Sequence, residues 1–69
     1  MRDRFMEQLK SLNTGLIEMG EMCETVITMA TDALINNNQE GAASVAVLDS
    51  DIDHKERDIE SLCLKLLLH

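Results

Sequence analysis

The chain has 69 residues, of which 13 are acidic and 6 basic, so its formal net charge is −7 and its pI is about 4.5. This balance, with one Phe and no Trp or Tyr, argues against nucleic-acid binding, which needs a basic patch and usually an aromatic platform. It also disfavours an anionic membrane surface. No apolar run reaches the ~18–20 residues of a membrane span, and no signal-peptide core follows the charged start. We therefore expect a cytoplasmic protein without direct membrane insertion.

Residues 3–35 are predicted to form the first helix. Apolar side chains recur along it in alternate steps of four and three, which is the period of a helix that packs lengthwise against other helices. They are Phe5, Leu9, Leu12, Leu16, Met19, Cys23, Val26, Ala30 and Ala33. A helix of this span is ~50 Å long, so it must pack along its length against something. Further apolar residues off this series indicate a bundle of three or more helices, with one face left over for a missing partner.

Residues 36–38, three consecutive asparagines, are predicted to form the turn. Asparagine tolerates the left-handed conformation that ends a helix, and its side chain caps the next one. Asn37, with Glu40 three residues on, resembles a capping box. So short a connection makes the helices antiparallel neighbours, in which residues whose numbers sum to about 75 lie level. Cys23 and Cys63 are then ~18 Å apart along the axis, which excludes a disulfide within the hairpin.

Residues 39–68 are predicted to form the second helix. Its hydrophobic seam follows the same alternate spacing of three and four, and consists of Val45, Leu48, Ile52, Lys55, Ile59, Leu62 and Leu66. Lys55 is the one charged member, and it weakens packing unless its stem reaches along the apolar surface and places the ammonium in water.

Four carboxylates border this seam. Asp49, Asp53, Glu56 and Glu60 follow at intervals of four, three and four, so they fall within an arc of about 60° on the helix. Like charges at this spacing cost a helix roughly 0.2–0.5 kcal/mol per pair. Two explanations remain open: a solvated face relieved by local pairs of Asp51 with Lys55 and Asp53 with Arg57, or a bound cation.

The cation reading rests on ligand chemistry. Hard divalent or ferric ions take oxygen ligands, and two carboxylates one turn apart can bridge them. Spacing alone does not single out a pair among the four carboxylates, and it favours the solvated face. Glu21, Glu24 and Thr25 lie level with this region and are further candidate oxygen ligands.

No catalytic constellation emerges. The chain has no Gly-rich phosphate loop, no H-E-x-x-H, no nucleophile elbow and no Glu-x-x-His of a di-iron site, and neither cysteine has a histidine placed to activate it. We expect no enzyme, no catalytic residues and no organic cofactor.

The sequence resembles the N-terminal part of the PhoU family of phosphate-transport accessory and regulatory proteins. The block Asp49-x-x-Ile52-Asp53-x-x-Glu56-x-x-Ile59-Glu60-x-x-Cys63 is its most specific part. The other matching residues are Met1-Arg2, Phe5, Leu9, Leu12, Leu16, Met19-Gly20, Ala30, Ala33-Leu34, Ala42, Val45 and Leu66-Leu67.

The resemblance implies an all-α fold in which this chain, residues 1–69, is a partial PhoU-like domain: an antiparallel helical hairpin that forms two helices of a three-helix bundle. It further implies a motif, filled by Asp49 and Asp53, that binds iron or another divalent or trivalent metal ion, and we expect Glu56 and Glu60 as additional ligands. The implied function is regulation of phosphate uptake and phosphate-regulon signalling. The implied partners are the phosphate ABC transporter, a sensor histidine kinase and further copies of the chain in a dimer or larger homo-oligomer.

The chain departs from the family pattern in several places. Family chains run to some two hundred residues. Gly41 and Lys55 stand where the family prefers leucine, and Asn38 stands where it prefers aspartate.

The alternative to a phosphate regulator is a non-catalytic structural hairpin that oligomerises through its heptad seams, in which the acids only confer solubility.

Overall fold

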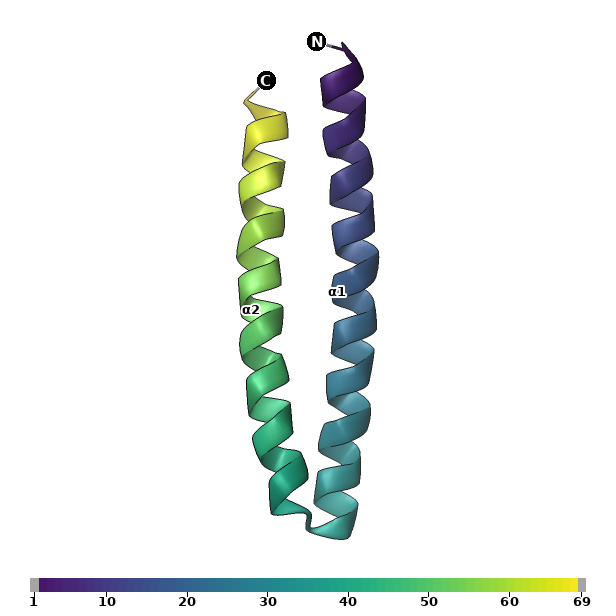
Figure 1. Ribbon diagram of the computed structural model, residues 1–69, viewed down its shortest axis with the longest axis vertical. Coiled ribbons are helices and arrows are strands. Elements are labelled where there is room, and N and C mark those ends of the chain that lie inside the picture. The colour runs from purple at the N-terminus through teal and green to yellow at the C-terminus, as the bar shows by residue number, and fades with distance from the viewer. Residues whose placement is uncertain (1, 69) are drawn as a thin grey trace.

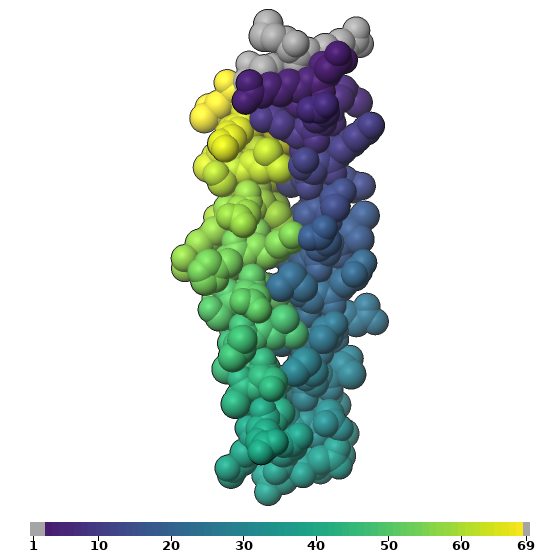
Figure 2. Space-filling model, in the orientation of Figure 1, coloured from purple at the N-terminus to yellow at the C-terminus, as the bar shows by residue number. Residues whose placement is uncertain are grey.

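The computed structural model describes residues 2–68, and the side chains of residues 3–68. Two helices, α1 (Arg2–Asn36) and α2 (Gln39–Leu67), run antiparallel and side by side (Figure 1). Their side chains meet along most of a rod that measures 52 × 15 × 13 Å (Figure 2). The predicted all-α helical hairpin is thus confirmed. Over the described residues, neither helix contains a stretch long and apolar enough to cross a bilayer.

The turn is built from asparagine conformations. Asn37 has a φ of 50°, the left-handed conformation that ends α1. The next amide, of Asn38, donates a hydrogen bond of 3.0 Å to the carbonyl of Ala33, five residues back. This is the Schellman pattern, which satisfies a carbonyl that the last helical turn leaves without a partner.

The cap of α2 is Asn38, so the capping box predicted at Asn37 is wrong by one residue. Asn38 has extended backbone angles, and its side-chain oxygen accepts a hydrogen bond of 3.1 Å from the amide of Gly41. A Cβ on Gly41 would lie 3.0 Å from the amide nitrogen of the Asn38 side chain. The glycine therefore leaves room for this cap.

The seam of α2 lies where its spacing predicts, since all seven of its residues are half-buried. On α1, however, the predicted series is only partly right. Leu9 and Leu16 are 37% and 45% exposed, whereas Gln8 and Gly15, one residue earlier, are half-buried against α2. At Gly15 the two helices come close, because a Cβ there would lie 3.4 Å from Ile59. Helix α1 therefore turns a glycine and a glutamine toward α2 and leaves two leucines outside.

The hairpin has no interior. None of the described side chains is fully buried, and several large apolar side chains on both helices are more than half exposed. Cys23 and Cys63 are half-buried free thiols. Two helices can cover only one side of each other, so half-burial is the most that this arrangement offers.

Lys55, the charged residue of the seam, is held by the facing helix. Its ammonium forms an ion pair with the carboxylate of Glu18 on α1. The Lys55 side chain is 27% exposed and that of Glu18 is 52% exposed, so the stem lies along the seam while the charges stay near water. The anticipated weakening of the seam at Lys55 is therefore relieved by a contact between the helices.

Replacement of the cap should weaken the hairpin measurably. We expect Asn38→Ala to lower the free energy of unfolding by about 0.5–2 kcal/mol, because the Gly41 amide loses its acceptor. The control is Asn36→Ala, which removes only an exposed side-chain bond to Asp32. Urea denaturation followed by circular dichroism at one chain concentration measures both. Equal losses in the two variants would contradict the assignment of the cap.

Replacement of the seam lysine, Lys55, should stabilise the hairpin. We expect Lys55→Leu to raise the free energy of unfolding by about 1 kcal/mol, since a half-buried leucine gains more than an exposed ion pair of ~0.2–1 kcal/mol loses. Lys10→Leu, on the exposed side of α1, is the control and should change little. The same denaturation experiment measures both, and a destabilised Lys55→Leu would show that the pair with Glu18 dominates.

Candidate functional site

The candidate site is the acidic edge, which we define as Asp49, Asp53, Glu56 and Glu60 of α2. All four side chains are exposed. Each follows a half-buried seam residue by one position, so all four lie on the same side of the seam, about 100° around the helix from it. The predicted alignment of four carboxylates along one edge is thus a property of the structure.

The edge presents two pairs of carboxylates at a spacing that metal ligands can use. Asp49 and Asp53 are separated by one helical turn, as are Glu56 and Glu60, and this spacing suits a pair of oxygen ligands. Across residues 2–68, however, no three His, Cys, Asp or Glu side chains come together in a group that could hold a metal ion. A cation at this edge would therefore take its remaining ligands from water or from another segment.

The acidic edge takes part in no ion pair of the described residues. Among the residues that the structure describes, the one ion pair joins Lys55 to Glu18. The alternative pairs of Asp51 with Lys55 and of Asp53 with Arg57 are therefore not formed. Arg57 does line a shallow hollow together with Asp53, Glu56 and Glu60, so it offsets part of the charge by proximity.

The other candidate oxygen ligands do not join this edge. Glu21, Glu24 and Thr25 line a separate hollow on α1, with Thr28 and Met29. The Thr25 hydroxyl donates to the Glu21 carbonyl at 3.0 Å, so it is engaged within its own helix. Rotation of α1 about its axis, which the level register alone does not specify, places these groups apart from the edge.

His54 lies outside the edge as well. It is exposed, and its Nδ1 lies 2.8 Å from the backbone carbonyl oxygen of Ser50, one turn earlier. The nitrogen that faces this carbonyl must carry the proton, so Nδ1–H is the donor. His54 therefore makes a local contact within α2.

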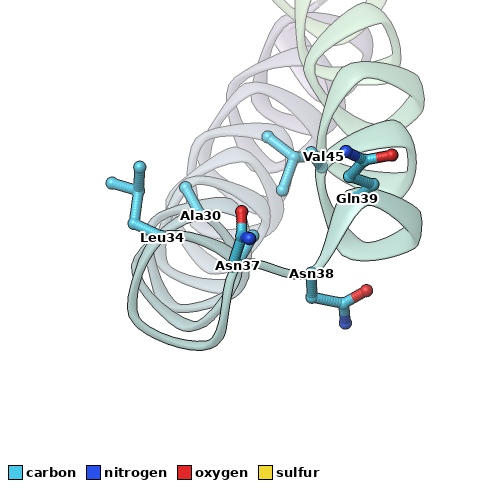
Figure 3. Close-up of a pocket in the computed structure, with 8 residues that line it drawn as sticks. Ala30, Leu34, Asn37, Asn38, Gln39 and Val45 are labelled. Atoms are coloured by element: carbon cyan, nitrogen blue, oxygen red, sulfur yellow. The ribbon is translucent and has the colours of Figure 1, made fainter.

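A second feature, an apolar groove, opens at the turn end of the hairpin. Ala30 and Leu34 come from α1, Gln39 and Val45 from α2, and Asn37 and Asn38 from the turn (Figure 3). Ala33 and Ala42 complete its lining. Small side chains leave this end of the helix pair open, and its wall is mostly apolar.

Two parts of this surface escaped the sequence reasoning. The pairing of Glu18 with Lys55 was not predicted, although residues whose numbers sum to about 75 are expected to lie level and these two sum to 73. The exposure of Leu9 and Leu16 was also missed. The signal was the second regular series through Gln8 and Gly15, which shares the same heptad spacing but is less apolar.

Comparison with known proteins identifies the family. The sequence profile of the PhoU domain matches residues 16–69, most of the chain. The "Phosphate-specific transport system accessory protein PhoU homolog" of Zymomonas mobilis subsp. mobilis (strain ATCC 31821 / ZM4 / CP4) is 33% identical over 63 residues, or 91% of this chain. The chain spans 27% of the length of that relative, and no solved structure gives a significant match. On the profile match and this identity, the chain belongs to the PhoU domain family.

Proposed function

We propose that this chain acts in a PhoU-type accessory protein of phosphate transport, which regulates phosphate uptake and phosphate-regulon signalling. The observation that carries this proposal is the family match over residues 16–69, together with a relative named for phosphate-specific transport. By the same argument its partners are the phosphate ABC transporter and a sensor histidine kinase, and its place is the cytoplasm. The role is non-catalytic: the chain works by binding.

Within this function, the acidic edge is proposed to hold a metal ion. Asp49 and Asp53 would bind iron or another divalent or trivalent cation through their carboxylate oxygens, and Glu56 and Glu60 would extend the site. Support comes from the alignment of four exposed carboxylates without an ion pair among the described residues. A bound cation would relieve the repulsion between these groups and would need further ligands from outside α2.

A second candidate function is favoured by the exposed apolar surface. The hairpin has large apolar side chains on its outside and no fully buried side chain among the described residues. A structural module that self-associates through its heptads into a dimer or larger homo-oligomer would cover this surface. In that case the acids serve solubility only, and neither phosphate signalling nor metal binding follows.

Regulation of the phosphate response separates the two candidates. We expect the protein, expressed in a bacterial strain that lacks its own PhoU, to repress a phosphate-starvation reporter in phosphate-rich medium. A variant with Leu48→Asp and Ile52→Asp, which breaks the seam, should fail to repress. A reporter that stays fully active in the presence of expressed, helical protein would contradict the regulatory role and favour the structural module.

Metal binding is tested independently by calorimetry with iron or manganese. We expect saturable binding that falls at least about tenfold in affinity in Asp49→Asn/Asp53→Asn, because the paired oxygen ligands are removed. The matched control is Asp51→Asn/Asp58→Asn, which removes the same charge from the opposite side of the seam and should retain binding. Equal loss in both variants would mean that net charge, and not the edge, attracts the cation.

A further inference from the structure

Methionine occupies the middle of the α1 face that packs against α2. Between residues 19 and 30, six side chains of α1 are half-buried, and three of them are Met19, Met22 and Met29. A further methionine, Met6, is 50% exposed and lies outside this face. Methionine fills irregular space with a flexible thioether, and oxidants convert that same group into a polar sulfoxide.

The contacts between the helices show which α2 residue lies opposite each methionine. A Cβ on Gly15 would lie 3.4 Å from Ile59, and a Cβ on Gly41 would lie 3.6 Å from the Cβ of Ala33. In both pairs the residue numbers sum to 74. Both helices rise by the same ~1.5 Å per residue, so this sum holds along the whole seam between them.

Two of the methionines therefore face apolar side chains. Met22 lies level with Ile52, and Met29 lies level with Val45. Both α2 residues are half-buried members of the seam, and Val45 points toward α1 in Figure 3. Neither side chain has a hydrogen-bond donor. A polar group formed on Met22 or Met29 would thus find no partner on the side chain that it faces.

Met19 has a different neighbour. It lies level with Lys55, whose ammonium is paired with Glu18, the residue next to Met19 in the chain. An ammonium has three N–H donors. An oxygen on the Met19 sulfur would therefore have a donor at its own level of the seam.

We propose that Met22 and Met29 are oxidation sites that control the stability of the hairpin. The reaction is a two-electron oxidation by a peroxide or a hypohalous acid. The thioether sulfur gains one oxygen atom, while hydrogen peroxide is reduced to water, or hypochlorous acid to chloride and a proton. In the seam, the new oxygen either stays unpaired against an apolar side chain or draws the side chain out into water. Both outcomes remove apolar contact between the helices.

An oxidant reaches these sulfurs because the hairpin has no interior. None of the described side chains is fully buried, and Met22 and Met29 are half-buried. A half-buried thioether reacts in the folded state, although more slowly than an exposed one, whereas a fully buried one is protected until the protein unfolds. The seam therefore responds to oxidant without prior unfolding, and methionine sulfoxide reductases reverse the change.

The test uses the 69-residue chain with Cys23→Ala/Cys63→Ala, because free thiols also react with oxidants. After treatment with hydrogen peroxide, peptide mapping by mass spectrometry identifies the oxidised residues, and urea denaturation followed by circular dichroism measures stability. We expect the folded-to-unfolded ratio to fall about tenfold or more once Met22 and Met29 are oxidised. Treatment with reductases for both sulfoxide epimers should restore it.

Paired variants on this background assign the effect to the two sites. Met22→Leu/Met29→Leu should keep its stability after peroxide treatment, because leucine has a similar volume and no sulfur to oxidise. The matched control is Met6→Leu/Met19→Leu, which also removes two methionines. This control should lose as much stability on oxidation as the parent chain does.

Three results would overturn the proposal. One is unchanged stability of the parent chain after Met22 and Met29 are converted to sulfoxides. Another is equal protection by the two variants, because the number of sulfoxides and not their place in the seam would then decide. The third is oxidation of Met22 and Met29 as fast as that of Met6 in the untreated fold, since the seam would then shield neither.

Helix content is the second readout, for a urea transition too broad to analyse. A fall in helix content on oxidation of the parent chain, absent in Met22→Leu/Met29→Leu, supports the proposal. Equal helix content before and after oxidation contradicts it.

Discussion

The constraint on which the rest of this structure depends is that two helices side by side have no interior. Every seam residue of α2 is half-buried, yet none of the described side chains is fully buried. Hydrophobic stabilisation scales with the apolar area removed from water, so half-buried leucines and isoleucines deliver only part of what they would give in a core. The fold class is set by this seam, but its stability depends on what covers the outer faces.

This constraint explains why α1 carries more apolar surface than the hairpin uses. A helix with one neighbour needs a narrow seam, whereas a helix with two neighbours needs two adjoining ones. Helix α1 packs on α2 through a series that includes Gln8 and Gly15, and it presents Leu9 and Leu16 beside that series. The better apolar residues are thus on the side that α2 does not cover. In a PhoU domain, such a surface is consistent with a bundle of more than two helices.

The sequence predicted the elements, their antiparallel order and the seam of α2, because these follow from spacing alone. It failed where rotation about the helix axis decides the outcome. Heptad spacing allows α1 to face α2 through Leu9 and Leu16 or through Gln8 and Gly15, and only packing chooses between them. The turn was predicted at the three asparagines, and it lies there. Which asparagine takes which role could not be predicted, because the three side chains are chemically identical. In the structure Asn37 is the left-handed residue and Asn38 is the cap.

The acidic edge, too, could be predicted only in part from the sequence. Its four members could be aligned on one side of α2 from their intervals, whereas the pairing of Lys55 with Glu18 required knowledge of which α1 residues border the seam. Local pairs within α2 are the natural expectation for a single helix. In the hairpin, a lysine inside the seam reaches across to the neighbouring helix, and so the edge keeps its carboxylates for other contacts.

The two-residue turn has a mechanical consequence. Asn37 and Asn38 are both engaged, one by its left-handed backbone and the other as a cap, so the connection holds no slack. To slide α2 along α1 by one turn, ~5.4 Å, the chain would have to unwind residues at the end of one helix. Rotation of either helix about its own axis would take the half-buried seam residues, and the ion pair of Lys55 with Glu18, out of contact. The turn therefore fixes the register of the two helices, and the seam fixes their rotation, so the hairpin behaves as one stiff rod.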